Sequence, residues 1–281
     1  MNRRQQMIGY NRTVKLKWLD ETLDLYLAGM SDADIHQSLR DRLKGEMSVG
    51  REPKRGSREK TITLLLKTWV RVPKALRATR DDGIKRLQGV RRADRLPFHW
   101  GMTMAAYPFW RVVADVTGRL FRLQGTVAPL QVQRRAKELL GEREVVARST
   151  RYVLRAFADW GVIDDSRKKG EYSPVPPIQI TDLKTVVWLL EAAVLSMPGT
   201  SVDFASLVKA PSLFPFRIGR IYPEQLMESG RLDVIRHGLE GVLVRAKPGN
   251  ATKAALDQMA KEAYQAGLYD RTEIPEGGED E

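Results

Sequence analysis

Three helices followed by a short β-hairpin are predicted between Pro108 and Ile180, and this stretch constrains the fold more than any other. Apolar residues recur at helical spacing in three segments: Phe109–Leu123, Leu130–Leu140 and a segment that ends near Trp160. Gly125 and Gly141 end the first two helices, because glycine takes the left-handed backbone of a helix C-cap without strain. Only the turn Gly141-Glu142-Arg143 separates the second helix from the third. This spacing is typical of a helix-turn-helix.

The hairpin is expected directly after the third helix. Trp160-Gly-Val-Ile163 ends that helix and begins a strand, and residues 164–170 form a polar, basic turn that contains glycine. Glu171-Tyr172, followed by Ile178–Ile180, can form the returning strand. Three helices and a hairpin with a basic tip are the pattern of a winged helix-turn-helix.

The exposed side of the third helix carries candidate contacts to nucleic acid. Val146, Val153 and Phe157 lie on its apolar stripe, which leaves a serine and several arginines towards solvent. Cations there can bind phosphates, and serine or arginine side chains can reach base edges. The candidates in this region are Arg134, Arg135, Arg143, Arg148, Ser149, Arg151, Arg155 and, at the wing tip, Arg167, Lys168 and Lys169. The alternative is a solvated helix face in a winged helix that contacts only protein.

Positive charge concentrates in the N-terminal two-thirds of the chain, whose net charge over its full length is +12. Residues 1–100 hold 23 lysines and arginines against 12 aspartates and glutamates, and residues 101–180 hold 13 against 8. Residues 181–281 reverse the sign, with 11 against 15. This distribution is expected if the first two-thirds face a polyanion. The segment 51–95 is a second candidate phosphate-binding surface, through Lys54, Arg55, Arg58, Lys74, Arg77, Arg91 and Arg92.

The expected fold is mainly α, and the length of 281 residues agrees with two domains and a small third one. We expect a basic helical N-terminal domain at 1–95, a winged helix-turn-helix domain with a small β-hairpin wing at 96–181, a helical C-terminal domain at 182–275 and an acidic tail at 276–281.

Two N-terminal features refine this expectation. Helices are predicted at Val14–Ala28 and, capped by Ser31, at Asp32–Leu43, a pair that can also begin a second helix-turn-helix. The interruption Asp81-Asp82-Gly83 favours two helices, rather than one, between Lys74 and Leu87.

Further along the chain, the aromatic run from Leu96 to Trp110 most simply forms a buried core between the N-terminal helices and the winged domain, with a base-stacking platform as the alternative. The helix Asp182–Met197 is almost wholly apolar, so it is buried or pairs with another chain. Leu232–His237 is predicted as a short helix, Val242–Val244 as a short strand and Ala251–Ala266 as a helix.

The residues that catalysis and cofactors need are scarce. The absence of cysteine excludes disulfides and thiolate metal sites, and the three histidines stand apart from one another. Phosphate-cradling glycine loops are missing as well. Asp164, Asp165 and Glu171, with nearby lysines, resemble the acidic pair of a metal nuclease, but charges on a wing are usually solvated. We therefore expect a non-enzymatic protein without metal or cofactor.

Neither a membrane span nor a signal peptide is expected. No apolar run approaches the roughly 20 residues that a transmembrane helix needs, and the basic residues of Met1–Gln6 precede no apolar signal core. We expect a cytoplasmic protein without membrane contact.

The layout of helices, central winged helix and further helices resembles that of the A-type accessory protein of BREX phage-exclusion systems. The stretches Leu96-Pro-Phe-His-Trp100 and Trp160-Gly-Val-Ile163 are similar to it. That family is small, basic, cytoplasmic and without catalytic residues. The resemblance implies double-stranded DNA binding and an accessory role in a multi-gene phage-defence locus, and it adds no site residue to those that charge and spacing indicate.

The sequence therefore predicts a sequence-tolerant DNA-binding accessory protein. Its third winged-domain helix would lie in the major groove, while the wing and the segment 51–95 lie on the backbone. One alternative is an interaction module that assembles a larger complex, with self-association through 182–197 or contacts to other defence proteins. Another is RNA binding, although A-form grooves do not admit a recognition helix.

Overall fold

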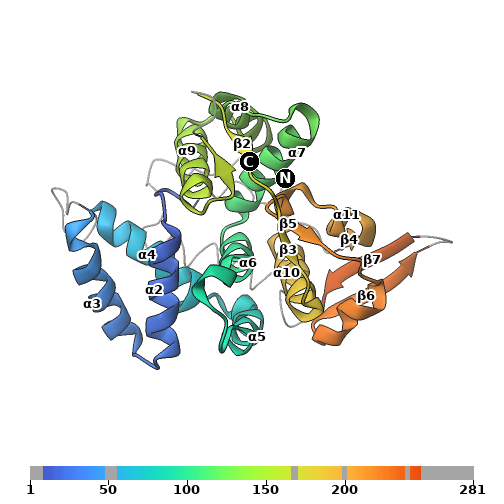
Figure 1. Ribbon diagram of the computed structural model, residues 1–281, viewed down its shortest axis with the longest axis horizontal. Coiled ribbons are helices and arrows are strands. Elements are labelled where there is room, and N and C mark those ends of the chain that lie inside the picture. Colours follow the sequence, from blue (N-terminus) through green and yellow to red (C-terminus); the bar gives the residue numbers. More distant parts are fainter. Residues whose placement is uncertain (1–8, 48–55, 166–169, 198–200, 238–240, 248–281) are drawn as a thin grey trace, which may run out of the picture.

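The computed structural model describes residues 9–47, 56–165, 170–197, 201–237 and 241–247, which are mainly helical with three small sheets (Figure 1). Within these ranges, no helix combines the length and the apolar character needed to cross a bilayer. Several predicted features lie outside the described residues: Lys54, Arg55, the wing-tip residues Arg167, Lys168 and Lys169, the helix Ala251–Ala266 and the acidic tail 276–281.

The N-terminal part is a group of helices, as predicted. It contains α2 (Leu16–Leu27), α3 (Asp32–Arg42), α4 (Ser57–Trp69) and α5 (Arg77–Leu87), with short 3₁₀ turns η1 (Leu43–Gly45), η2 (Lys74–Leu76) and η3 (Arg92–Asp94). Ser31 caps α3 as expected, since its Oγ accepts a hydrogen bond of 3.2 Å from the N–H of Asp34. Helices α2 and α3 both pack against α4.

Helix α5 is continuous through Asp81-Asp82-Gly83, so the prediction of two helices there is wrong. Gly83 lies against the indole ring of Trp188 in α10 (Leu183–Ser196), and a Cβ at residue 83 would lie 2.9 Å from Trp188 Cζ2. The glycine therefore allows a close helix contact and does not end the helix.

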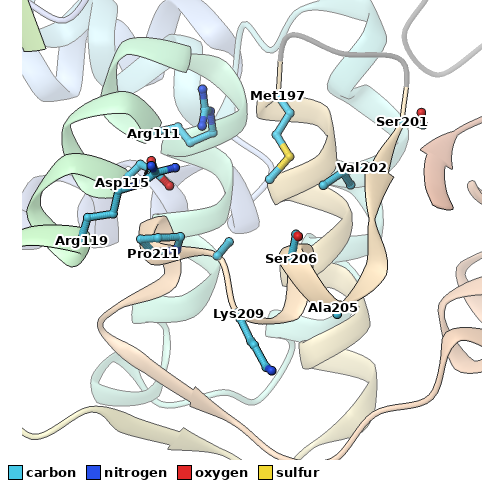
Figure 2. Close-up of a pocket in the computed structure, with 11 residues that line it drawn as sticks. Arg111, Asp115, Arg119, Met197, Ser201, Val202, Ala205, Ser206, Lys209 and Pro211 are labelled. Atoms are coloured by element: carbon cyan, nitrogen blue, oxygen red, sulfur yellow. Dashed lines mark ion pairs between the residues drawn. The ribbon is translucent and has the colours of Figure 1, made fainter. Parts of the chain in front are cut away.

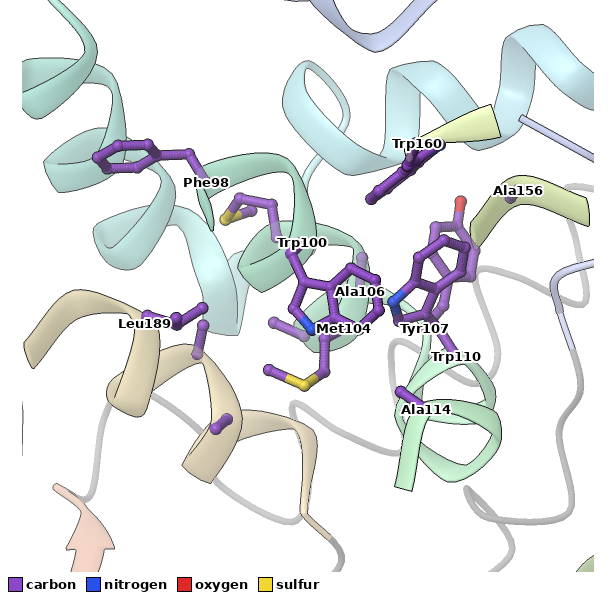
Figure 3. Packing of buried hydrophobic residues seen from close by; sticks show 14 of the residues in the cluster. Phe98, Trp100, Met104, Ala106, Tyr107, Trp110, Ala114, Ala156, Trp160 and Leu189 are labelled. Atoms are coloured by element: carbon purple, nitrogen blue, oxygen red, sulfur yellow. The ribbon is translucent and has the colours of Figure 1, made fainter. Parts of the chain in front are cut away.

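Helix α6 (Leu96–Ala106) is the centre of the molecule, and all its residues are buried. It packs against α4, α7 (Pro108–Gln124) and α10. Trp100 contacts Trp110 and Phe157 with ring centroids 5.4 and 5.0 Å apart, and Trp160 lies on the same cluster (Figure 3). The aromatic run is therefore core, as predicted, and its burial leaves no platform on which a base could stack.

Indole hydrogen bonds join segments that are distant in the sequence. Trp160 Nε1 donates to the carbonyl oxygen of Val14 at 2.9 Å, and Trp188 Nε1 donates to that of Thr79 at 2.8 Å. Trp100 Nε1 donates to the carbonyl of Ser212 at 3.1 Å. These bonds and one continuous hydrophobic core connect the N-terminal helices, the central helices and the C-terminal elements.

The three central helices match the prediction. They are α7, α8 (Pro129–Leu140) and α9 (Glu144–Asp159), and all three pack against one another. After α9, β1 (Ile163–Asp164) pairs antiparallel with β2 (Ser173–Pro174), and Tyr172 forms an antiparallel bridge with Val127, which precedes α8.

The returning strand is shorter than predicted. Residues Ile178–Ile180 form β3, which pairs parallel with β5 (Phe216–Ile218) and not with β1. The prolines in Val175-Pro176-Pro177 separate β2 from β3, because proline lacks the N–H that continues a ladder.

The C-terminal part is mixed α/β where the structure describes it, so the prediction of a helical domain is wrong there. After α10 follow β4 (Val202–Asp203), α11 (Phe204–Val208), η4 (Pro211–Leu213), β5, α12 (Pro223–Leu226), η5 (Met227–Ser229), β6 (Leu232–His237) and β7 (Gly241–Ala246). Strand β7 lies between β4 and β6 in an antiparallel sheet. The predicted helix Leu232–His237 is thus a strand, whereas the strand at Val242–Val244 is confirmed.

Helix α10 is buried within the chain, which confirms the first of the two alternatives for its apolar surface. All residues from Val186 to Ser196 are buried, against α5, α6 and β7. Its one buried carboxylate, Glu191, accepts bonds of 2.7 and 2.8 Å from the guanidinium of Arg231 and a bond of 2.6 Å from Thr79 Oγ1. The buried charge is therefore paired and hydrogen-bonded, as burial in low dielectric requires.

Candidate nucleic-acid interface

Helix α9 has one face in the core and one in solvent. Val146, Val153 and Phe157 are completely buried, whereas Arg148, Arg151 and Arg155 are exposed. These arginines have the spacing i, i+3 and i+7, which places them within one narrow stripe of an α-helix. We name the three arginines the α9 arginine stripe.

Two of the three arginines have no ion-pair or hydrogen-bond partner in the part of the chain that the structure describes. Arg151 Nη2 lies 3.4 Å from Glu144 Oε1, and both side chains are at least half exposed. Arg148 and Arg155 have no such neighbour within the described ranges. The stripe therefore presents at least two unneutralised guanidinium groups on a rigid helix.

The short strands that follow α9 lie near its last arginine, Arg155. Burial raises the pKa of Tyr172 above its ordinary value, Asp165 adds to the rise, and the positive charge of Arg155 opposes it. The charge of Arg155 thus acts on Tyr172, directly before β2, so this end of the stripe lies near the β1–β2 pair.

Ser149 does not lie on this surface, and the prediction that it faces solvent is wrong. Its side chain is completely buried, and its Oγ has no hydrogen-bond partner. The residue lies one position after Arg148, which rotates it by about 100° around the helix towards the core. Ser149 therefore cannot contact a base edge in this conformation.

The arginines of α8 have an acidic side chain nearby, so their charge is more strongly neutralised than that of Arg148 and Arg155. Arg135 Nη1 is 2.7 Å from Glu138 Oε2, and Arg134 Nε is 3.8 Å from Glu138 Oε1. Arg143, in the turn before α9, donates from Nη2 to the carbonyl oxygen of Leu140 at 3.3 Å. Arg134 and Arg135 remain exposed, so they can still reach a polyanion from the edge of the α8–α9 unit.

The N-terminal candidates do not join the α9 arginine stripe in one patch. Arg92 pairs with Asp24 near the end of α2, whereas the carboxylate of Asp159, at the end of α9, accepts from the N–H of Leu16 at the start of α2. Leu16 and Asp24 are eight residues apart on α2, which is about 12 Å along the helix axis at 1.5 Å per residue. The segment 74–95 and α9 therefore lie at opposite ends of α2 (Figure 1).

The candidate cations of the N-terminal segment also differ in how exposed they are and in whether they are already paired. Arg58 is only 8% exposed, so the prediction that it lies on an exposed phosphate-binding surface is wrong. Arg91 pairs with Asp94 at 2.8 Å. Lys74 and Arg77 are exposed. The best placed cations of this set are therefore Lys74 and Arg77, near the start of α5.

The structure brings together a second group of cations that the sequence did not predict. Arg111 and Arg119 of α7 and Lys209, after α11, line one pocket on the side of α7 that faces η4. The spacing of Arg111, Asp115 and Arg119 at i, i+4 and i+8 places them on one helix face. This spacing is the one feature of the sequence that could have indicated the group. Lys209 lies far away in the sequence and reaches the pocket only through the fold.

The described residues contain no group of three or more histidine or acidic side chains that could hold a metal ion. Neither a protein-family model, nor a curated protein, nor a solved structure matches the chain. Any functional conclusion therefore depends on the arrangement of its own side chains.

Proposed function

We propose that the protein binds double-stranded DNA through a winged helix-turn-helix unit formed by α7, α8, α9, β1 and β2. The short turn 141–143 between α8 and α9 supports this assignment, as does the bridge from Val127 to Tyr172, which adds a third extended segment to β1 and β2. In such units, the helix after the tight turn enters the major groove. Helix α9 is the equivalent helix here.

The observation that carries the proposal is the α9 arginine stripe. Arg148 and Arg155 are exposed cations without a partner among the described residues, on a helix whose opposite face is fixed in the core. A phosphate or a guanine edge supplies the acceptors that these guanidinium groups lack. Phosphate contacts of this kind give affinity with little dependence on sequence.

A substitution pair tests this docking. The double variant Arg148→Gln and Arg155→Gln should lose at least about tenfold in affinity for a random-sequence duplex, since charged hydrogen bonds contribute roughly 1.5–3 kcal/mol each. The matched control is Arg236→Gln with Arg245→Gln, which removes the same charge from β6 and β7 at the far side of the molecule (Figure 1). Equal losses in the two variants would reject α9 as the contact helix.

The resemblance to the A-type BREX accessory protein extends this proposal to a role in a phage-defence locus. That role depends on the resemblance alone. Deletion of the gene should abolish protection against phage, while substitution of the α9 arginine stripe should weaken it. Full protection by a stripe variant that no longer binds DNA would separate the defence role from DNA binding.

A further inference from the structure

A pocket of about 760 Å³ lies between α7 and the segment from the end of α10 to η4 (Figure 2). Helix α7 contributes Arg111, Asp115 and Arg119 to one wall. The opposite wall consists of β4 and α11, the start of η4 packs on α7, and Lys209 lies at the lower edge of the pocket in the figure. The volume is within the range of about 300–1,000 Å³ that small-molecule sites occupy.

The pocket has an excess of positive charge. Arg119 Nε pairs with Asp115 Oδ2 at 2.8 Å, which neutralises one cation with the only acid of the lining. Arg111 and Lys209 are left without an ion-pair partner in the described residues. Three cations against one carboxylate give the lining a net charge of +2, which complements a doubly charged anion.

Arg111 is the group that indicates a ligand. Its Nε is buried and has no hydrogen-bond partner, although a buried guanidinium normally finds one. Burial lowers the pKa of Arg111 below its ordinary value, Asp115 opposes this effect, and Arg119 adds to it. The protein thus keeps a partly desolvated cation at the pocket wall, and its buried Nε has no acceptor among the described residues.

The rest of the lining is apolar apart from Ser201 and Ser206. Met197, Val202 and Ala205 lie across the pocket from the arginines of α7 (Figure 2). A small inorganic ion would leave this wall without contacts. An anion with an organic body would cover it, while its charged group reaches Arg111.

We propose that this pocket binds a phosphate monoester of about mononucleotide size. The phosphate would accept from Arg111, and its organic body would lie on the Met197–Ala205 wall, towards the edge where Lys209 adds positive charge. A guanidinium fork matches the geometry of phosphate oxygens, and a monoester carries up to two charges at neutral pH, as the lining requires. Binding here is independent of DNA binding, because Arg111 lies on α7 and not on the α9 arginine stripe.

Calorimetric titration of the full chain with adenosine 5′-monophosphate, and separately with inorganic phosphate, tests the proposal. The wild-type protein should bind the nucleotide more tightly than inorganic phosphate. Arg111→Met should weaken nucleotide binding at least about tenfold, the effect of one lost charged hydrogen bond. The matched control Arg236→Met, which removes an arginine from β6, should leave binding unchanged.

Folding of the variants does not confound this test. Arg111→Met replaces a half-buried cation, whose Nε has no partner, with an apolar side chain, so its melting temperature without ligand should equal or exceed that of the wild type. Lys209→Gln, at an exposed position, provides a second variant that should also bind the nucleotide more weakly. Absence of nucleotide binding to the wild type, or equal binding by wild type and both variants, would overturn the proposal. Equal affinity for nucleotide and inorganic phosphate would overturn the role of the apolar wall.

Discussion

Gly83 lies directly against the indole of Trp188, so close that a Cβ at residue 83 would lie 2.9 Å from Cζ2 and 3.1 Å from Cε2 of the ring. The indole cannot move away easily, because its Nε1 donates to the carbonyl oxygen of Thr79 at 2.8 Å. The approach of α5 to α10 thus depends on a residue without a side chain.

Gly83→Ala should therefore destabilise the protein, although alanine favours helices more than glycine does. The overpacked contact should reduce the free energy of unfolding by about 1–3 kcal/mol, measured by denaturant unfolding. Gly45→Ala is the matched control, because a Cβ at residue 45 meets no atom within 4 Å. An equal response of both variants would contradict the close packing of Trp188.

The buried pair between Glu191 and Arg231 supports a second prediction. Glu191→Gln removes the charge that faces the guanidinium and leaves Arg231 with Asp82 alone, at 2.7 Å. Breaking a buried pair from one side costs about 3–5 kcal/mol, which should appear as a large fall in the denaturation midpoint. Glu224→Gln breaks a surface pair with Arg236, whose side chain is 86% exposed, and should have no measurable effect. Similar stabilities of the two variants would contradict the buried network.

Local patterns predicted much of the helical architecture. The segments α7, α8 and α9 follow from apolar spacing together with the stops at Gly125 and Gly141, since both signals lie within the segments that they define. The cap of α3 by Ser31 is equally local. These features needed no information from distant parts of the chain.

The wrong predictions have long-range causes. Residues Leu232–His237 become a strand because β7 pairs with them along their whole length, and a six-residue segment carries too weak a pattern to show this. The pocket cations come together only when η4 packs on α7. Gly83 likewise resembles a helix break until its contact, 105 positions later in the sequence, is known.

The salt dependence of DNA binding gives a third prediction, distinct from affinity at one salt concentration. Each phosphate contact contributes about −0.9 to the slope of log K against log salt concentration. If Arg148 and Arg155 each bind a phosphate, the double variant should have a slope about 1.8 units shallower than that of the wild type. Titrations by fluorescence anisotropy over a range of salt concentrations measure both slopes. Parallel lines for the two proteins would mean that neither arginine lies on the backbone.

The buried histidine of α6 predicts a dependence of stability on pH. Trp69 Nε1 donates to His99 Nδ1 at 3.0 Å, so the Nε2–H donates to Asp20 Oδ1, also at 3.0 Å. Burial lowers the pKa of His99 below its ordinary value of 6.5, although the hydrogen bond to Asp20 opposes this, and the nearby charge of Arg95 lowers it further. His99 is therefore neutral in the folded protein near neutral pH.

The unfolded chain binds a proton at His99 more readily than the folded one does. This contribution to stability is complete above pH 6.5 and is lost as the pH falls towards the lower pKa of the folded state, with a slope of at most about 1.4 kcal/mol per pH unit. Urea unfolding at closely spaced pH values should reveal this loss in the wild type. His99→Gln should be less stable but should show a shallower pH dependence below pH 6.5. Parallel curves for wild type and variant would exclude His99 as the source of the loss of stability below pH 6.5.

Ser149 and Thr150 are neighbouring buried hydroxyls that should respond in opposite directions to substitution. Thr150 Oγ1 donates to the carbonyl oxygen of Val146 at 2.8 Å, whereas Ser149 Oγ has no partner. Ser149→Ala removes an unsatisfied polar group and improves helix propensity, so the protein should become more stable by about 0.5–1.5 kcal/mol. Thr150→Val loses a hydrogen bond at nearly constant volume and should be less stable by about 1 kcal/mol. Because Ser149 is buried, Ser149→Ala should also bind a DNA duplex as the wild type does. A folded Ser149→Ala variant with weakened binding would place this hydroxyl at the DNA after all, and would require α9 to rotate on binding.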